Sequence, residues 1–233
     1  MTDSHPRISI IMPAYNAERF IADAIRSLLT QPIKLDIIVI NDGSTDRTSS
    51  RVREFGDAVR PLDVAKNEGL PSALNHGLRL VRNADYIGFL DSDDIWSEDR
   101  LPLQLRLLGE NPEVAAVWGK SRIVFMSDDG QETESPQWPP RFFPQLATFL
   151  FRAAVFDQIG RFDERFRHAQ DTDFLARLKE AGLRVLQHDD VVLTWRRHEA
   201  NMTNQVALDR DYLASALREA LRRRRGGIAK HTG

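Results

Sequence analysis

The chain has 233 residues, enough for one large domain or two small ones, and hydrophobic residues make up 42% of it, so it can bury a sizeable core. Lysine and arginine (32) nearly balance aspartate and glutamate (34), and the formal net charge of -2 argues against a dedicated nucleic-acid-binding protein, which would carry a basic excess. There is no cysteine, which excludes disulfides, cysteine-ligated zinc and a cysteine nucleophile.

The first half of the sequence alternates short apolar runs with amphipathic stretches. Strands are predicted over residues 8–12, 35–40, 59–64 and 85–90. Helices are predicted over residues 17–30, from Ser44 or Thr45 as the N-cap to about Phe55, and over residues 68–82. This alternation predicts a parallel sheet with helices on both faces. Because ligands of such sheets bind at the carboxyl edge, residues 13–16, 41–44 and 91–94 should converge on one crevice.

The second half is less regular. A helix over residues 97–108 and a long extended stretch over 114–125 are followed by a polar segment, 127–144, which we interpret as a loop. Residues 147–156 lead into a turn with the sequence GRFDERF. A helix over residues 171–181 that ends at Gly182, two strands over 183–187 and 191–195, and a final amphipathic helix over 206–224 complete the prediction.

The acidic cluster that follows the strand at residues 85–90 is the sharpest local feature. Asp91, Ser92, Asp93 and Asp94 are consecutive, and carboxylates this close repel one another unless a cation lies among them. Mg²⁺ commonly joins one or two carboxylates to substrate phosphates. An isolated acidic motif is more often a solvated turn or a helix cap, but the position of this one at the expected ligand edge favours a metal site.

Three further features carry candidate chemistry, and each also has an ordinary structural explanation. Asp42 follows a buried strand and could accept hydrogen bonds from a base or ribose, or simply belong to a turn. Asp171 begins a helix, where an anion is favoured by the helix dipole, or acts as a general base. His198 is either a surface residue or a metal ligand, and Arg196 or Arg197 beside it could neutralise phosphate.

Taken together and in this order, the segments resemble the family 2 glycosyltransferases, which have the GT-A fold. The matching stretches cover roughly residues 8 to 203: SIIMPAYNAERFIADAIRSLL, DIIVINDGSTDRT, NEGLPSALNHGL, YIGFLDSDDIW, FDQIGRFDERF, QDTDFLARL and WRRHEANMT. The resemblance implies one α/β domain over residues 1–233, with a mostly parallel central sheet. Its parts would be a nucleotide-binding half (1–94), an acceptor-binding and catalytic half (95–205), and a C-terminal helix with a basic tail (206–233).

By the same resemblance, the protein would transfer a sugar from a nucleotide diphosphate, with uridine as the expected base, to a hydroxyl of a glycan, lipid-linked or peptide acceptor, with inversion. Asp171 would be the catalytic base, and Asp93 and His198 would bind Mn²⁺ or Mg²⁺. Asp94 is a further candidate at this site. The residues expected to bind the nucleotide sugar are Pro13, Tyr15, Asn16, Asp42, Asn67, Asp91 and Ser92.

One departure from the family pattern concerns the residue before the expected base. The family commonly has Glu-Asp there, whereas this chain has Gln170 followed by Asp171. An alternative function is therefore a catalytically impaired module that binds a nucleotide sugar and scaffolds a partner. A sugar nucleotidyltransferase or a nicotinamide-dependent enzyme is disfavoured, because the loop PAYNAE after the first strand has no glycine.

We also expect a cytoplasmic protein. The polar N-terminal sequence MTDSHPRIS does not resemble a signal peptide, and no apolar run approaches the ~20 residues that span a bilayer. The run Arg222, Arg223, Arg224 and Arg225 is explained by a solvated helix end, with peripheral contact to anionic lipid at the inner face of the membrane as the alternative.

Overall fold

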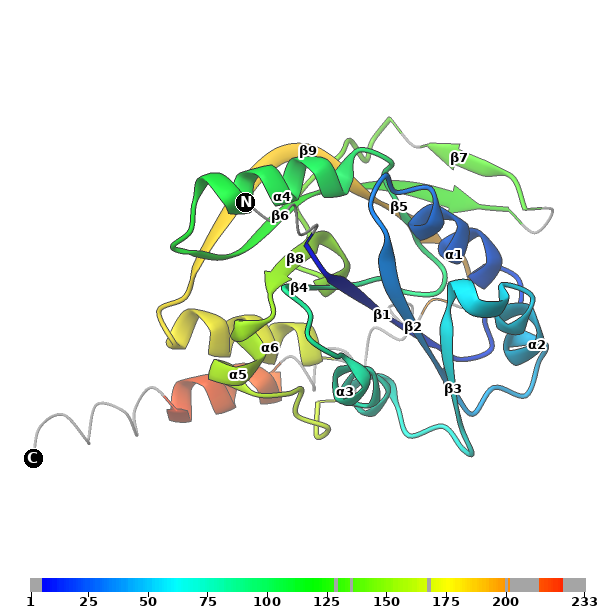
Figure 1. Cartoon of the computed structure of the whole chain (residues 1–233), viewed down its shortest axis with the longest axis horizontal. Helices are drawn as coiled ribbons and strands as arrows, with labels where there is room; N and C mark the ends of the chain where they lie inside the picture. The colour runs from blue at the N-terminus through cyan, green and yellow to red at the C-terminus, as the bar shows by residue number, and fades with distance from the viewer. Residues whose placement is uncertain are drawn as a thin grey trace, which may run out of the picture.

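The computed structural model describes residues 6–127, 130–134, 136–166, 169–199, 201 and 214–223. Within this part of the chain the strands form one sheet in the order β3-β2-β1-β4-β8-β6-β9-β5, and β7 pairs with β6 (Figure 1). Helices cover the sheet, which gives the α/β class that the sequence predicts.

The first half of the sheet is parallel. Strands β1 (Ile8–Ala14), β2 (Leu35–Asp42), β3 (Arg60–Val64) and β4 (Tyr86–Phe89) all run in the same direction. The helices between them are α1 (Ile21–Leu29), α2 (Thr48–Arg53) and α3 (Leu70–Leu80), with a 3₁₀ turn, η1, at Gly56–Ala58.

Successive side chains of β1 are buried on opposite faces of this half-sheet. Ile10 and Met12 belong to the core cluster that contains the apolar face of α1, whereas Ile11 belongs to the cluster that contains Leu74 of α3. A Cβ at Gly77 of α3 would lie 2.3 Å from the Cγ2 atom of Ile11, so the helix can approach the strand this closely only with glycine there. Burial on both faces explains why β1 and most of β2 are continuous apolar runs.

The second half of the sheet mixes directions. It consists of β5 (Ile95–Trp96), α4 (Arg100–Glu110), β6 (Val114–Met126), β7 (Glu132–Glu134), η2 (Leu146–Thr148), β8 (Phe149–Arg152), α5 (Ala154–Ile159), α6 (Gln170–Glu180) and β9 (Arg184–Arg197). Strand β8 joins the two halves, because it pairs antiparallel with both β4 and β6. Strands β6 and β9 form a long parallel pair.

A buried arginine holds the segment before β8 in place. Arg100 of α4 is 1% exposed, and its guanidinium donates to the carbonyl oxygens of Ala147 and Phe149. The same group lies 3.8 Å from the ring centroid of Trp96. These contacts satisfy the donors that burial would otherwise leave unpaired, and they fix the chain at η2, next to the cleft described below.

Three details differ from the sequence-based expectations. The strands predicted at 183–187 and 191–195 are one strand, β9, whose pairing with β6 contains register irregularities. The segment 127–144 is not entirely loop, because β7 pairs with the end of β6. Ser44 and Thr45 do not cap α2. Instead the N-cap position is Arg47, which makes no side-chain cap hydrogen bond, and Asp46 before it accepts from the backbone N–H of Thr48 at 2.9 Å.

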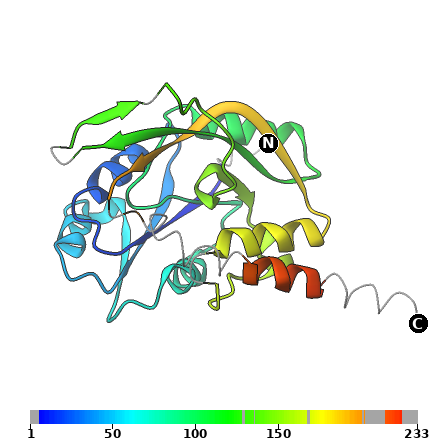
Figure 2. The same cartoon turned by 180° about the vertical axis from the view of Figure 1, so that it is seen from behind.

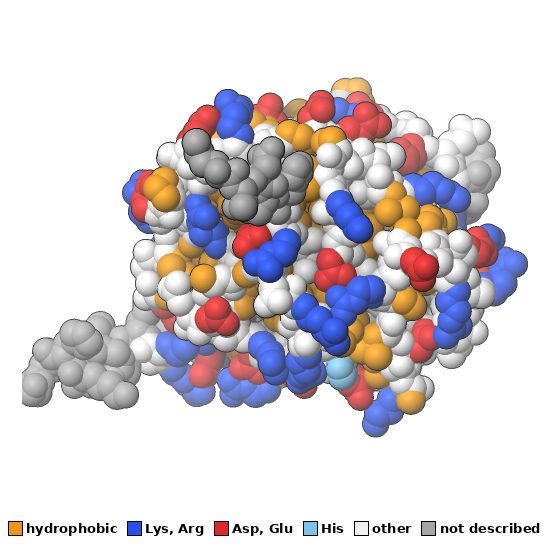
Figure 3. Space-filling model, viewed as in Figure 1, with side chains coloured by type: hydrophobic (Ala, Val, Ile, Leu, Met, Phe, Trp, Pro, Cys, Tyr) orange, Lys and Arg blue, Asp and Glu red, His pale blue; other side chains and the backbone are white. Residues whose placement is uncertain are grey.

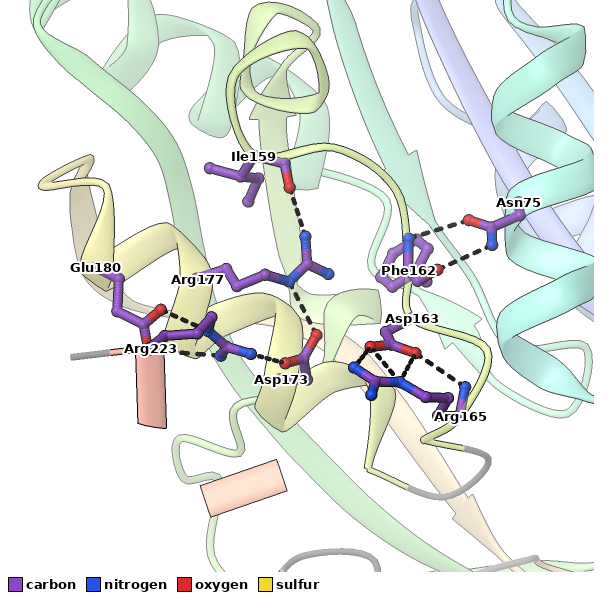
Figure 4. A network of polar contacts seen from close by, with 9 residues as sticks. All are labelled: Asn75, Ile159, Phe162, Asp163, Arg165, Asp173, Arg177, Glu180 and Arg223. Carbon is purple, nitrogen blue, oxygen red and sulfur yellow. Dashed lines mark hydrogen bonds and ion pairs between the residues drawn. The ribbon is translucent and has the colours of Figure 1, made fainter. Parts of the chain in front are cut away.

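The C-terminal helical segment, residues 214–223, lies beside α6 in both cartoon views (Figures 1 and 2). Arg223 donates to Glu180 at 2.7 Å and to the buried carboxylate of Asp173 at 3.0 Å (Figure 4). Arg222 pairs with Glu219 and is exposed. Arg223 is therefore engaged with the protein's own acids, while Arg224 and Arg225 lie outside the described residues.

Two features of the described residues relate to the predicted cytoplasmic location and membrane contact: the charges on the surface and the composition of the helices. On the face seen in Figure 3, basic and acidic side chains are interspersed. Within the described residues, no helix has the length and apolar character needed to cross a membrane.

Candidate active site

A cleft of about 660 Å³ opens at the carboxyl ends of β1, β2 and β4, the edge that the sequence pattern predicts for a ligand. The predicted site residues line this cleft with two exceptions, Arg196 and Arg197. Those that line it are Pro13, Tyr15, Asn16, Asp42, Asn67, Asp91, Ser92, Asp93, Asp94, Gln170, Asp171 and His198.

Asp42, at the end of β2, shapes one side of the cleft. Its two carboxylate oxygens accept from the backbone N–H groups of Glu68 and Gly69, both at 2.9 Å. Gly43 follows with φ +71°, and a Cβ there would lie 2.5 Å from the backbone nitrogen of Asn67. The Asp-Gly pair thus holds the loop before α3 against the strand end and places Asn67 in the cleft, a structural role that the sequence did not reveal.

The loop after β1 is tied to the loop after β2. The backbone N–H of Asn16 donates to the Ser44 hydroxyl at 2.9 Å, and the backbone N–H of Thr45 donates to the Asn16 side-chain oxygen at 2.9 Å. Ser44 and Thr45 are used in these contacts rather than in capping α2. Tyr15, carried by the same loop, is 49% exposed at the cleft and offers an aromatic surface to a ligand.

The acidic cluster after β4 crowds its carboxylates. Burial, and then the charges of Asp93 and Asp171, raise the pKa of Asp91 to about 8. Burial, and then Asp93 and Asp91, raise the pKa of Asp94 well above its usual value, against a hydrogen bond from the Arg196 backbone N–H. Each carboxylate penalises ionisation of its neighbours, which is the arrangement that a bound cation relieves.

Asp93 meets His198 across the cleft. The Nε2 atom of His198 lies 3.1 Å from a carboxylate oxygen of Asp93, and the imidazole stacks on Phe20 with 4.4 Å between ring centroids. The side-chain amide of Asn201 donates to the same oxygen of Asp93 at 3.1 Å. The predicted pair is thus brought into contact from residues 105 positions apart, and stacking orients the imidazole.

Asp171 lies in the first turn of α6. One carboxylate oxygen accepts from the Leu146 backbone N–H and the other from the Gln170 side-chain amide, both at 3.0 Å. Burial raises the pKa of Asp171 to about 6, and these two hydrogen bonds oppose the rise. A carboxylate with this pKa, oriented by two donors, is suited to accept a proton near neutral pH.

The two arginines beside His198 occupy other places than a phosphate site would require. Arg196 is 2% exposed, and its side chain donates to the carbonyl oxygens of Asp93 and Phe20. It therefore holds the acidic turn in place and does not line the cleft, and its role in neutralising phosphate stays a prediction. Arg197 lies over the ring of Trp195, 5.1 Å from the centroid, and does not line the cleft.

Several lining residues were missed by the sequence reasoning. Asn201 contacts Asp93, and Phe143, Gln145 and Trp195 form part of the wall near Asp171. The sequence could have indicated Asn201, because this residue lies only three positions after the candidate metal ligand His198. For the other three there was no local signal, since Trp195 is placed by the pairing of β9 with β6, and the segment with Phe143 and Gln145 is held by contacts with Ser121 of β6.

Comparison with known proteins agrees with this geometry. The profile of glycosyl transferase family 2 matches residues 9–172. An uncharacterised glycosyltransferase of Rickettsia typhi (strain ATCC VR-144 / Wilmington) is 29% identical over 214 residues, which is 85% of this chain and 66% of that protein. The chain thus spans slightly less than two thirds of the length of such curated relatives.

Solved structures share the fold at low sequence identity. The mannosyltransferase PcManGT from Pyrobaculum calidifontis, in complex with GDP-Man and Mn²⁺, has a TM-score of 0.75 at 20% identity and covers 94% of this chain and 65% of its own. S. aureus TarS 1-349 with UDP-GlcNAc has a TM-score of 0.70 at 21% identity, over 85% and 60% of the two chains. These likenesses show the GT-A fold, and the profile match over residues 9–172 shows that the chain belongs to glycosyl transferase family 2.

Proposed function

We propose that this protein is a metal-dependent, inverting glycosyltransferase that moves a hexosyl group from a uridine diphosphate sugar to an acceptor hydroxyl. The observation that carries the proposal is that Asp93, paired with His198, and Asp171 open onto one cleft from separate elements. Family membership supports sugar transfer as the reaction type.

The donor is proposed to bind along β1, β2 and the start of α3. Tyr15 would stack on the base, and Asn67 and the backbone around Gly69 would offer hydrogen-bonding groups to the nucleoside. Asp42 would contribute mainly by holding that loop in place. The likeness to structures that contain UDP-GlcNAc or GDP-Man supports a nucleotide sugar as the donor class.

The donor set fits Mn²⁺ or Mg²⁺. Asp93 offers a carboxylate oxygen and His198 an imidazole nitrogen within 3.1 Å of each other, beside the crowded acids Asp91 and Asp94. No group of three or more histidine or acidic side chains is arranged as a complete metal site among the described residues. Mg²⁺ usually takes only one or two protein ligands and completes its shell with phosphate oxygens and water, so two ligands suffice. The cation would neutralise charge on the leaving diphosphate.

Asp171 is proposed as the general base. It would accept the proton of the attacking hydroxyl while the acceptor oxygen forms a bond to the anomeric carbon and the bond to the diphosphate breaks. A single displacement of this kind inverts the anomeric configuration. The hydrogen bonds from Leu146 and Gln170 hold the carboxylate in a fixed orientation for this transfer.

Replacement of the proposed base tests the assignment. In Asp171→Asn, UDP release from UDP-sugars with Mn²⁺ present should fall by at least about a hundredfold, the lower range for general base catalysis. UDP binding, measured by calorimetry, should stay within about threefold of the wild type. Unchanged turnover would mean that another group is the base. A wild-type protein that binds UDP-sugars but neither hydrolyses nor transfers them would favour the scaffold alternative.

A further inference from the structure

The wall of the cleft beside Asp171 is aromatic, unlike the acidic floor. Phe143 and Trp195 both line the cleft, with ring centroids 5.1 Å apart and planes at 74°. Both side chains are half-buried. The pair presents apolar surface to the cleft, close in the chain to residues that contact Asp171, so this wall favours a ligand with an apolar face.

A short path of contacts connects this aromatic pair to the proposed base. The backbone N–H of Gln145 donates to the Phe143 carbonyl at 2.8 Å, and Leu146, the next residue, donates to Asp171. The proposed donor side, in contrast, is built from β1, β2 and the loop before α3. The stretch of chain that positions Asp171 therefore also carries Phe143, which makes this wall the place where a molecule that brings a hydroxyl to Asp171 is expected to lie.

The side-chain amide of Gln170 is a further polar group at the cleft. Its side chain is buried, with 8% exposed, and its Nε2 donates to Asp171. Its Oε1 atom is buried and has no hydrogen-bond partner among the described residues. A buried carbonyl of this kind is costly when unpaired, and Gln170 lines the cleft, so a hydroxyl of a bound ligand can satisfy it.

We propose that the acceptor is a saccharide whose pyranose ring packs on Trp195 and Phe143. Its attacking hydroxyl faces Asp171, and a neighbouring hydroxyl donates to the Oε1 atom of Gln170. This inference rests on the proposed function of Asp171.

The chemistry of the wall distinguishes a sugar from the other acceptor classes. A pyranose has a C–H face that covers an aromatic ring and a rim of hydroxyls that pairs with carboxylate and amide groups. An acyl chain would leave Gln170 unpaired and place apolar groups beside the acids. A serine or threonine side chain supplies a hydroxyl but no flat apolar face for Trp195.

Binding measured by saturation-transfer difference NMR tests this directly. The full chain, saturated with UDP and Mg²⁺, is probed with methyl glycosides of glucose, galactose and N-acetylglucosamine, with N-acetylserine amide and 1-hexanol as the other classes. At least one glycoside should bind with saturation strongest on its ring C–H protons. Trp195→Ala should weaken that binding by about tenfold or more, and Phe143→Ala by several-fold.

Trp138→Ala is the matched control, since Trp138 is 42% exposed, packs against Arg141 and does not line the cleft. It should bind the glycoside as the wild type does, and all variants should keep UDP affinity. Glycoside binding that is absent, or unchanged in Trp195→Ala, overturns the inference, as does preferential binding of the serine or alcohol probe. Equal weakening of UDP-GlcNAc and UDP-glucose binding would assign the aromatic pair to the donor sugar instead. Failure of the wild type to bind UDP would count against the proposed function itself.

Discussion

At the position before the proposed base, an amide replaces the carboxylate that the family pattern leads one to expect. The side chain of Gln170 donates to Asp171 at 3.0 Å, which favours the ionised form of that carboxyl and opposes the rise of its pKa by burial. A glutamate in the same place would add a second negative charge instead. Glutamine at this position is therefore compatible with Asp171 acting as a base, and it does not indicate a loss of activity.

Gln170→Glu tests this interpretation. The new charge should raise the pKa of Asp171 above about 6, because it adds a carboxylate next to Asp171 and removes the hydrogen bond from Gln170 that lowers this pKa. The base works only when deprotonated, so a higher pKa lowers activity on the acid side. Turnover at pH 6 should fall roughly three- to tenfold, with little change above pH 8.

The measurement is kcat/KM between pH 5 and 9, with Gln158→Glu on the exposed side of α5 as the control for added charge. If the acidic limb of the kcat/KM profile lies at the same pH in Gln170→Glu as in the wild type, Gln170 does not influence the pKa of Asp171.

The sequence indicated which polar residues belong to the site, but it did not indicate which other residues each of them contacts. Asp42 and Asp93 follow from the rule that polar groups after parallel strands share an edge, whereas Asp171 was predicted from its place at the start of a helix and from the family resemblance, and all three line the cleft. The buried position of Arg196 was not predictable, because it depends on which way each residue of β9 points after its irregular pairing with β6.

At the scale of elements, α6 is held from two sides (Figure 4). Asp173, 1% exposed, accepts from Arg177 at 2.9 Å on its own helix and from Arg223 at 3.0 Å on the C-terminal helix. Arg177 also donates at 2.5 Å to the carbonyl of Ile159, the last residue of α5. These contacts fix the helix whose first turn carries Asp171, so the C-terminal helix supports the site without lining it.

Arg223→Ala should reduce the free energy of unfolding by about 1–3 kcal/mol, since it leaves Asp173 with one cationic partner and removes the contact with Glu180. Arg222→Ala, at a side chain that is 80% exposed, should change it by less than about 0.5 kcal/mol. Urea unfolding of both variants measures the difference. Equal effects would mean that the ion pairs of Arg223 add nothing to the stability of the native state.

The turn after β2 supports a second prediction at this scale. Gly43→Ala would place a Cβ 2.4 Å from the carbonyl carbon of Lys66 and force alanine to adopt φ +71°. We expect a loss of about 2–4 kcal/mol in stability and weaker UDP binding, because the loop that carries Asn67 must move.

Gly130→Ala is the control, since Gly130 also has positive φ but no atom within 4 Å of the added Cβ. A comparable loss in both variants would show that backbone conformation alone, and not the packing against Lys66, sets the cost.

The regular elements of the first half were predicted well because β1, β2 and β4 are largely buried on both faces and α1 and α3 each bury one apolar face. The second half was harder. Strand β9 runs through the polar stretch that contains His188, Asp189 and Asp190, which the periodicity divided in two. Strand β7 consists of three exposed residues and gives no hydrophobic signal. Both exist because they pair with β6, and such long-range pairing leaves little trace in local sequence.

At the scale of the whole molecule, the sheet is continuous between the parallel half and the mixed half. The cleft is lined from both, with residues up to Asp94 on one side and residues from Phe143 onward on the other. The division into a nucleotide-binding half (1–94) and an acceptor-binding half (95–205) stays a prediction. If it is correct, donor and acceptor meet where the two halves of one sheet adjoin.

The proposed site holds a cation through Asp93 and His198, which follow strands far apart in the sequence, together with the diphosphate of a nucleotide. Thermal unfolding with UDP, with and without Mn²⁺, measures this linkage, since a ligand at 100 times its Kd stabilises the native state by about 2.7 kcal/mol. We predict that UDP and Mn²⁺ together raise the Tm by several degrees more than the sum of their separate effects, and that Asp93→Asn abolishes this excess. Additive shifts in the wild type, or an excess that survives in Asp93→Asn, would contradict the account.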